Sequence, residues 1–392
     1  MAPKELRICV FGLWHLGSVT AACCAENHTV VGLDFNLDYI EKLKKGKAPI
    51  KEPGLDELLQ RGIKRLNLTF TNDTNKAVKN ADLIWVTEDT PVGKKNKPKS
   101  EKTLKRIASV LSKANRGTIV LISSQLPVGT IRLLEKQYPN LEFAVMPENL
   151  QLGDAINRFK HADRIVLGTR SNAARNLLIN LLEEFSEDIL HMTPESAELT
   201  KHALNGFLAL SIAYANEVSH IARKVGANPD DIGRALKADE RIGRKAYLMP
   251  GAPYAGQTLG RDVHLLGNMA SSNEPILKNL AASNKAHKKE FFRRIINEIK
   301  EKVGDLKNRE ILIAGLTYKS NTSTLNGSLG LELATKLKCL GAKIALYEPN
   351  IKGINEINGM QLIKLEKKSR YNTIVIFRPE LEITATNKII AY

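Results

Sequence analysis

The fold of the first part of the chain is decided by Leu6-Arg-Ile-Cys-Val-Phe-Gly-Leu-Trp-His-Leu-Gly17, followed by Thr29-Val-Val-Gly-Leu-Asp34. Residues 6–12 form a short apolar run that ends in glycine, which is typical of a buried parallel strand. A helix is expected after the glycine turn, and the second apolar run is expected to form the next strand. Strand, turn, helix and strand in this order predict a doubly wound α/β domain.

Gly12, Gly17 and Asp34 stand where a dinucleotide-binding turn needs them. Such a turn needs a glycine for its tight bend, another for close packing of helix on strand, and an acid about 20 residues on to bind the adenosine ribose. Trp14 occupies the middle glycine position, where phosphate oxygens usually meet backbone N–H groups. The motif predicts dinucleotide binding, and a doubly wound domain whose cofactor site has decayed is the alternative.

More strands are expected in the first part of the chain. The apolar runs are Asp82-Leu-Ile-Trp-Val-Thr87, Thr118-Ile-Val-Leu-Ile-Ser123 and Leu141-Glu-Phe-Ala-Val-Met146. Because they alternate with amphipathic helical segments, they predict a parallel sheet that is covered by helices. We assign residues 1–193 to this first domain.

The middle of the chain has a helical pattern. One long helix is predicted from Pro194 to Lys224, and more helix from Pro229 to Lys237. The apolar residues that recur at helical spacing in the long helix are Leu199, Ala203, Phe207, Leu210 and Ala213. Residues 194–300 are therefore predicted to form a helical connector domain.

Strand signals return near residue 310. The predicted strands are Glu310–Gly315, Ala342–Glu348 and Tyr371–Phe377, with a helix over Gly330–Cys339. The same alternation predicts a second, smaller doubly wound domain over residues 301–392. The expected fold class is thus α/β, with two Rossmann-like domains joined by a helical domain.

Composition restricts the classes of protein that fit the chain. Its 392 residues are 43% hydrophobic and 26% charged, as in a soluble globular protein. The four cysteines have no metal-ligand spacing, and neither a signal peptide nor a membrane-spanning run is evident, so we expect a cytoplasmic protein without a metal. The net charge of +16 suits diphosphate ligands. Its basic clusters lack interleaved aromatic residues, so we expect no nucleic-acid partner.

The most specific stretch of the sequence is Asp239-Glu-Arg-Ile-Gly243 with Pro250-Gly-Ala-Pro-Tyr-Ala-Gly-Gln-Thr-Leu-Gly-Arg-Asp262. It resembles the active-site segment of the UDP-glucose/GDP-mannose dehydrogenase family. Further segments resemble that family in the same order along the chain, namely Gly46–Leu55, Thr90-Pro91, Pro127–Thr130, Pro147-Glu148, Ala197–Lys201 with Asn205, and Gly315–Lys319.

The resemblance implies an NAD-dependent oxidoreductase that acts on the C6 hydroxyl of a nucleotide sugar, most simply a UDP-hexose, in polysaccharide precursor synthesis. It also implies that the first domain holds NAD, that the last domain holds the nucleotide, and that the long middle helix forms a homodimer. A membrane partner is not expected.

The resemblance also assigns roles to residues. Lys201 would stabilise the alkoxide, Asn205 would donate a second hydrogen bond to it, and Asp262 would orient water or balance the lysine. The other residues implied in catalysis are Glu148 and Thr258. The residues implied in cofactor binding are Gly12, Leu16, Gly17, Asp34, Thr90 and Lys319. The residues implied in substrate binding are Arg241, Glu148, Leu150, Tyr254 and Gly256.

Thr258 departs from the family pattern, because it stands where the family has a nucleophilic cysteine. An alcohol is barely ionised near neutrality, so a thioester intermediate is not accessible to it. Gln125 replaces a water-holding threonine, Leu152 replaces a second glutamate, and Asn326 replaces an arginine near the substrate. The family's second oxidation, from aldehyde to acid, is therefore in question.

Several functions remain open at this point. The protein could catalyse both oxidations by way of a hydrated aldehyde, or it could stop at the aldehyde. It could instead be a non-catalytic paralogue that binds NAD and a nucleotide sugar. A nucleic-acid-binding protein is a distant further alternative. The product formed and the NADH released per sugar distinguish the first three.

Overall fold

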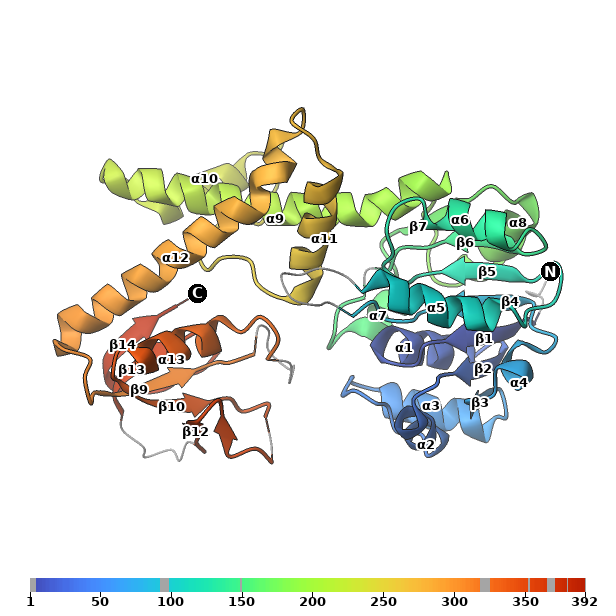
Figure 1. Cartoon of the computed structure of the whole chain (residues 1–392), viewed down its shortest axis with the longest axis horizontal. Helices are drawn as coiled ribbons and strands as arrows, with labels where there is room; N and C mark the ends of the chain where they lie inside the picture. The colour runs from blue at the N-terminus through green and yellow to red at the C-terminus, as the bar shows by residue number, and fades with distance from the viewer. Residues whose placement is uncertain are drawn as a thin grey trace. The chain divides into compact units, whose positions relative to one another are not determined.

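A computed structural model describes residues 5–91, 99–148, 150–317, 325–351, 353–364, 371–378 and 380–391. The chain divides into two compact units, Met1–His202 and Ala203–Tyr392. Each unit carries its own β-sheet with helices (Figure 1). The finer division at residues 193 and 300 stays a prediction.

The sheet of the first unit has the strand order β3-β2-β1-β4-β5-β6-β7-β8. Its neighbouring strands pair in parallel, except that β6 and β7 are antiparallel. The strands are β1 (Arg7–Phe11), β2 (Thr29–Leu33), β3 (Leu68–Thr71), β4 (Leu83–Val86), β5 (Ile119–Ile122), β6 (Glu142–Val145), β7 (Ile165–Thr169) and β8 (Ile189–Met192). The helices are α1 (His15–Cys24), α2 (Leu37–Lys44), α3 (Leu55–Lys64), α4 (Thr74–Val78), α5 (Ser100–Leu111), α6 (Thr130–Gln137), α7 (Ala155–Lys160) and α8 (Asn172–Leu182).

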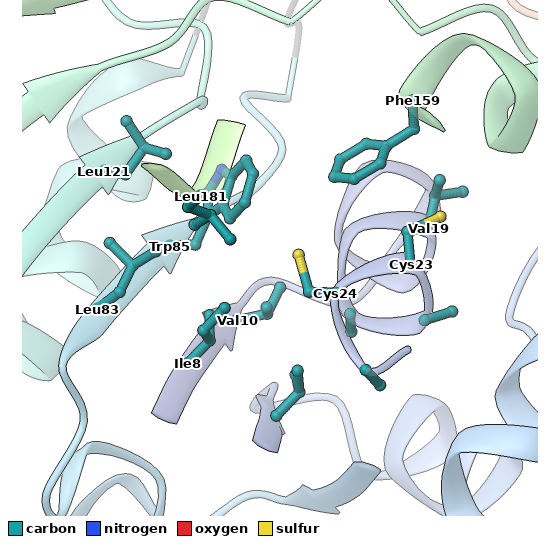
Figure 2. Packing of buried hydrophobic residues seen from close by; sticks show 14 of the residues in the cluster. Ile8, Val10, Val19, Cys23, Cys24, Leu83, Trp85, Leu121, Phe159 and Leu181 are labelled. Atoms are coloured by element: carbon teal, nitrogen blue, oxygen red, sulfur yellow. The ribbon is translucent and has the colours of Figure 1, made fainter. Parts of the chain in front are cut away.

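Helices cover both faces of this sheet, because alternate residues of each strand point to opposite sides. In β1, Ile8 and Val10 pack in one core with α1, α3, α7 and α8, whereas Cys9 and Phe11 pack in the other with α4, α5 and α6. Figure 2 shows part of the first core, where Phe159 of α7 lies beside α1 and Trp85 of β4 lies beside Leu181. The ring centres of Trp85 and Phe159 are 6.0 Å apart. The predicted α/β class is confirmed for this unit.

Three cysteines belong to these cores. Cys9 lies in β1, and Cys23 and Cys24 lie side by side near the end of α1 (Figure 2). Burial raises the pKa of Cys9 and of Cys23 to about 12 and holds the pKa of Cys24 well above its usual value. Cys339, which lies in the second unit, is exposed.

The second unit contains long helices and a smaller sheet. The boundary between the units falls within α9 (Pro194–Lys224), whose bounds agree with the predicted helix, and the helices that follow are α10 (Pro229–Ala238), α11 (Gln257–Met269), α12 (Pro275–Val303) and α13 (Leu329–Cys339). The sheet has the order β11-β12-β10-β9-β13-β14 and is parallel apart from the β11–β12 pair. Its strands are β9 (Glu310–Ala314), β10 (Lys343–Tyr347), β11 (Glu356–Ile357), β12 (Met360–Leu362), β13 (Tyr371–Ile376) and β14 (Ala385–Ile390).

The first turn of this second sheet is built like the glycine turn of the first. Gly315 has a φ of +88° and donates its N–H to Tyr347, as Gly12, with a φ of +97°, donates to Leu33. Glu348 then accepts from the backbone N–H of Leu316 at 2.9 Å. The prediction of a second Rossmann-like sheet agrees with this turn, because Gly315 and Gly12 have a similar backbone geometry and the same kind of hydrogen bond.

The described residues contain neither a membrane-spanning helix nor a candidate metal site. No helix among them is long and apolar enough to cross a membrane. Within the same ranges, no three or more His, Cys, Asp or Glu side chains are grouped so as to hold a metal ion.

Candidate active site

The glycine turn between β1 and α1 is closely packed. An added Cβ at Gly17 would lie 1.8 Å from the Gly12 carbonyl oxygen and 2.6 Å from the Thr87 hydroxyl oxygen. At Gly12, it would lie 2.5 Å from Cα of Glu88. The hydroxyl of Thr87 donates to the Gly12 carbonyl oxygen at 2.8 Å, which fixes the turn from β4. The N-terminus of α1 is therefore held where only glycine fits, and it presents free backbone N–H groups to an anion.

Asp34 lies at the end of β2, beside this turn, and is buried. Its carboxylate accepts from the backbone N–H of Leu13 at 2.7 Å and from that of Asn36 at 2.8 Å. Arg106 of α5 lies 3.5 Å from Asp34 and 2.7 Å from Glu88, so one guanidinium balances two carboxylates. Burial raises the pKa of Glu88, and Arg106 opposes that shift.

Arg106 was not recognised from the sequence. Its guanidinium lies 4.9 Å from the ring centre of Phe35, directly after Asp34 in the chain. The contact across β2 and α5 depends on the tertiary fold, because a lone arginine on an amphipathic helix carries no signal of its own.

Trp14 and His15 occupy the centre of the glycine motif. Trp14 is 43% exposed, so its indole is not part of the core. His15, the first residue of α1, places Nε2 2.8 Å from a carboxylate oxygen of Glu52. The same buried carboxylate accepts from the backbone N–H groups of Gly153 at 2.9 Å and Ala155 at 3.0 Å. Glu52 thus connects the glycine turn to the loop before α7. The sequence showed Glu52 only as part of a family motif and gave no indication of these contacts.

Leu16 and Thr90 complete the predicted cofactor residues in the first unit. Leu16 is the second residue of α1 and is half-buried. Thr90 follows β4, and its buried hydroxyl has no hydrogen-bond partner among the residues that the structure describes. Lys319, the remaining predicted cofactor residue, lies outside the described residues.

A recess in the first unit brings together β5, β6 and the start of α9. Its lining residues are Ile122, Ser124, Gln125, Leu126, Thr130, Val145, Pro147, Glu198 and Lys201. The buried hydroxyl of Ser124 has no hydrogen-bond partner among the described residues. Glu198 accepts from the backbone N–H groups of Gly129 at 2.6 Å and Ile131 at 2.9 Å, which anchors α9 beside the recess. Lys201 is therefore placed on a fixed helix that borders this recess.

Gln125 is oriented by the buried His202. His202 Nε2 lies 3.2 Å from the Leu126 carbonyl oxygen, which only accepts, so Nε2 carries the proton. Nδ1 of the neutral ring is then an acceptor, and the Gln125 amide NH₂ donates to it at 3.2 Å. Gln125 can accept a hydrogen bond through its remaining oxygen, but it cannot act as the hydroxyl that a threonine would supply.

The second unit contains three of the predicted catalytic residues. Asn205, one helical turn after Lys201 on α9, donates its side-chain amide to Asp262 of α11. Asp262 is fully buried, and Nε of Arg261 lies 3.4 Å from its carboxylate. Thr258 is the second residue of α11 and is exposed. The sequence therefore places Thr258 and Asp262 one turn apart on the same helix.

Three predicted substrate residues lie near Thr258 in sequence. Burial raises the pKa of Tyr254 to about 12, and Gly256 has a φ of +90° directly before α11. Arg241 is exposed and pairs with Asp239 at 2.7 Å. That pair lowers the pKa of Asp239 and raises that of Arg241, through the side-chain hydrogen bond in each case.

Glu148 and Leu150 lie in the first unit, after β6. The carboxylate of Glu148 accepts a short hydrogen bond from the backbone N–H of Leu150. Pro147, directly before Glu148, lines the recess beside Lys201.

Comparison with known proteins identifies the family. The model of the UDP-glucose/GDP-mannose dehydrogenase family NAD-binding domain matches residues 6–186, and that of the family's central domain matches residues 195–286. The chain belongs to this family. The UDP-glucose 6-dehydrogenase TuaD of Bacillus subtilis is 30% identical to it over 88% of the chain and 76% of the relative.

Two further proteins of the family are similar to the chain. The GDP-mannose 6-dehydrogenase of Pseudomonas savastanoi pv. phaseolicola is 32% identical over 88% of the chain and 81% of the relative. The structure of a UDP-glucose dehydrogenase from Pyrobaculum islandicum superposes with a TM-score of 0.83 at 27% identity, covering 96% of this chain and 90% of that one. The predicted family, fold class and cofactor, NAD, are thereby confirmed.

The residues of the first unit fit NAD. Gly12 and Gly17 keep the turn tight, so that the N-terminus of α1 could bind the pyrophosphate and Asp34 could bind the ribose. The Thr90 hydroxyl, which lacks a partner within the described ranges, is a further polar group that a ligand could satisfy. Trp14, at the middle glycine position, is exposed.

Proposed function

We propose that this protein is an NAD-dependent oxidoreductase that converts the C6 hydroxyl of a UDP-hexose into an aldehyde, and that it works as a homodimer. Bound NAD supplies the hydride acceptor. The observation that carries the proposal is the set of polar groups on and beside α9. Lys201 borders the recess of the first unit, and Asn205 is held by the buried Asp262.

Each of these groups has a task in the proposed oxidation. When the C6–H bond breaks, its electron pair leaves as hydride and the hydroxyl proton passes to solvent or to a nearby base. Lys201 stabilises the negative charge that develops on the C6 oxygen, and the amide of Asn205 donates to the same oxygen. Asp262 fixes the orientation of that amide, because one hydrogen of the amide NH₂ is donated to its carboxylate.

Two local features favour an aldehyde product. Thr258 offers an alcohol where a thioester would need a thiolate. Gln125 has no hydroxyl with which to hold a hydrolytic water. Its side-chain amide is hydrogen-bonded to His202. The aldehyde therefore has no evident covalent route to the acid in this chain.

A homodimer is supported by an exposed apolar row on α9. Phe207, Tyr214 and Ile221 follow one another at seven-residue intervals and are 65%, 51% and 61% exposed. Seven residues are close to two helical turns, so these side chains share one face of the helix. A second copy of the chain would cover that face, and Arg241 would act on the sugar of the partner subunit.

The proposal is tested by counting NADH per sugar consumed. UDP-glucose and GDP-mannose are incubated separately with NAD, and the products are identified by mass spectrometry. We expect turnover of UDP-glucose with about one NADH per sugar and a C6 aldehyde or its hydrate. Two NADH per sugar with a uronic acid would contradict the aldehyde product, and preference for GDP-mannose would contradict the UDP assignment.

A non-catalytic binding protein is the second candidate, favoured by the exposed Thr258 alcohol in place of a thiol. Intact binding of NAD and UDP-glucose without any NADH would establish it. The variant Thr258→Cys separates the causes. We expect it to accumulate covalently bound sugar, because the groups that would hydrolyse a thioester are also changed. Rapid acid formation by this variant would show that Thr258 alone blocks the second oxidation.

A further inference from the structure

We propose that a set of buried and half-buried side chains on α9 and α12 positions the loop that carries the substrate residues before Thr258. This polar clamp consists of Asn216, His220, Asn284 and His287. The inference rests on the proposed function for its catalytic consequence, but the clamp itself is a property of the second unit.

The clamp binds the start of the loop through Asn216. The backbone N–H of Gly251 donates to the Asn216 side-chain oxygen at 3.0 Å. The Asn216 side-chain amide donates in turn to the Ala252 carbonyl oxygen at 3.4 Å. One amide therefore satisfies a donor and an acceptor of consecutive residues, which fixes the local backbone direction.

The clamp binds the other end of the loop through Asn284. The Tyr254 N–H donates to the Asn284 side-chain oxygen, and the Asn284 amide donates to the Tyr254 carbonyl oxygen, both at 3.0 Å. Both backbone groups of Tyr254 are thus held by a single side chain of α12. The backbone of Gly256, two residues later, is approached by Gly327, where an added Cβ would lie 2.9 Å from the Gly256 nitrogen.

His287 holds the Gly251 carbonyl, and His220 determines its protonation. His287 Nε2 lies 3.0 Å from the Gly251 carbonyl oxygen, so this nitrogen carries a proton. Nδ1 lies 3.0 Å from Nε2 of His220 and accepts from it. In this arrangement the His287 ring is neutral, because a second proton on it would face the N–H of His220.

The surroundings of the pair favour this neutral form. Burial lowers the pKa of His287 to about 4, and burial also lowers the pKa of His220. The charged groups that face the pair are Glu217 and Arg223 on α9 and Glu290 and Arg294 on α12. Because the pKa of His287 in the folded protein lies below 6.5, the contribution of its neutral ring to folded-state stability is complete above about pH 6.5. That contribution is lost as the pH falls through about 4.

The clamp matters for the proposed reaction because its loop runs directly into α11. Tyr254 and Gly256 lie within or next to the clamped segment, and Thr258 and Asp262 follow on the first turns of α11. A loop that is fixed in this way presents the substrate residues in one geometry, which lowers the ordering cost of sugar binding. The clamp residues are positioning residues, since none of them is assigned a contact with substrate.

Hydrogen exchange of the peptide spanning residues 250–257 tests the clamp without reference to activity. In the wild-type protein at pH 7 we expect protected amides at Gly251 and Tyr254. Asn284→Ala should raise exchange of that peptide at least tenfold, whereas Asn284→Asp keeps the acceptor for Tyr254 and should retain much of the protection. Exposed His191, changed to Gln, is the matched control and should leave exchange unchanged.

Two further measurements complete the test. In the wild-type protein, protection factors of this peptide should fall between pH 6.5 and 4 while those of residues 206–215 in α9 stay constant. Steady-state assays with UDP-glucose should show a KM at least tenfold higher for Asn284→Ala, with NAD affinity within twofold. Unchanged exchange in Asn284→Ala together with flat protection across this pH range would overturn the clamp. Altered exchange without any NADH formation would uphold the clamp and reject the proposed function.

Discussion

Gly17→Ala is the substitution whose effect follows most directly from the geometry of the glycine turn. The new Cβ would lie 1.8 Å from the Gly12 carbonyl oxygen, whereas ordinary contacts begin near 3.4 Å. The turn and α1 would have to separate by about 1.6 Å. Overpacking of this kind costs about 1–3 kcal/mol. The better helix propensity of alanine returns at most about 1 kcal/mol.

Because the 1.8 Å approach is to backbone, the cost lies in the upper part of that range, about 2–3 kcal/mol. The expected net destabilisation is then about 1–2 kcal/mol, which lowers Tm by roughly 2–8 °C for a unit of this size. The effect on NAD should be larger, because the backbone N–H groups at the start of α1 move away from the pyrophosphate. Losing even one hydrogen bond to a charged group costs about 1.5–3 kcal/mol. Calorimetric titration should therefore show NAD binding at least roughly tenfold weaker.

Gly267→Ala is the control for this experiment. Gly267 lies within α11, where an added Cβ meets only the Leu277 carbonyl oxygen at 3.5 Å. This variant should keep its NAD affinity and be as stable as the wild type or up to about 1 kcal/mol more stable. NAD affinity within twofold of wild type in Gly17→Ala, at unchanged Tm, would refute the close packing of turn and helix as the basis of cofactor binding.

Three other predictions concern the candidate site. Lys201→Ala should lower kcat by roughly 10²–10³-fold in steady-state assays while NAD affinity stays within twofold, and near-normal turnover would remove Lys201 from the mechanism. NADP should bind at least roughly tenfold more weakly than NAD in calorimetry, because its 2′-phosphate meets the buried Asp34 carboxylate, and equal affinities would contradict this role of Asp34. Arg241→Ala should raise the KM for UDP-glucose without dissociating the dimer in sedimentation, and a monomeric wild-type protein at micromolar concentration would refute the dimer.

The sequence predicted the elements whose patterns are strong and local. The bounds of α9 agree with the predicted helix, and β9, β10 and β13 fall within the predicted strands. The strands that were not predicted are β3, β7, β8, β11, β12 and β14. Most of these are short or lie toward a sheet edge, and β14 exposes alternate residues, so their apolar signal is weak. The antiparallel pairing of β6 with β7 was not predictable from local patterns, because it depends on the direction in which the chain re-enters the sheet.

The candidate site was predicted only in part, because several of its groups act through distant contacts. Glu52 was visible as part of a motif, but its bond to Gly153 joins residues 101 positions apart. Arg106 and His202 gave no signal, since each is defined by what the fold places around it. Gly12, Gly17 and Asp34 were predictable because a tight turn restricts the residue types that can occupy it.

The cysteines of this chain have a practical consequence. Attack on a maleimide requires the thiolate, and burial withholds both access and ionisation from Cys9, Cys23 and Cys24. The native protein should therefore react only at Cys339, the last residue of α13. It should accept a single spectroscopic label without any engineering. A fluorophore or spin label at that position reports on the second unit. Labelling of a second thiol would in turn signal that the core of the first unit has opened.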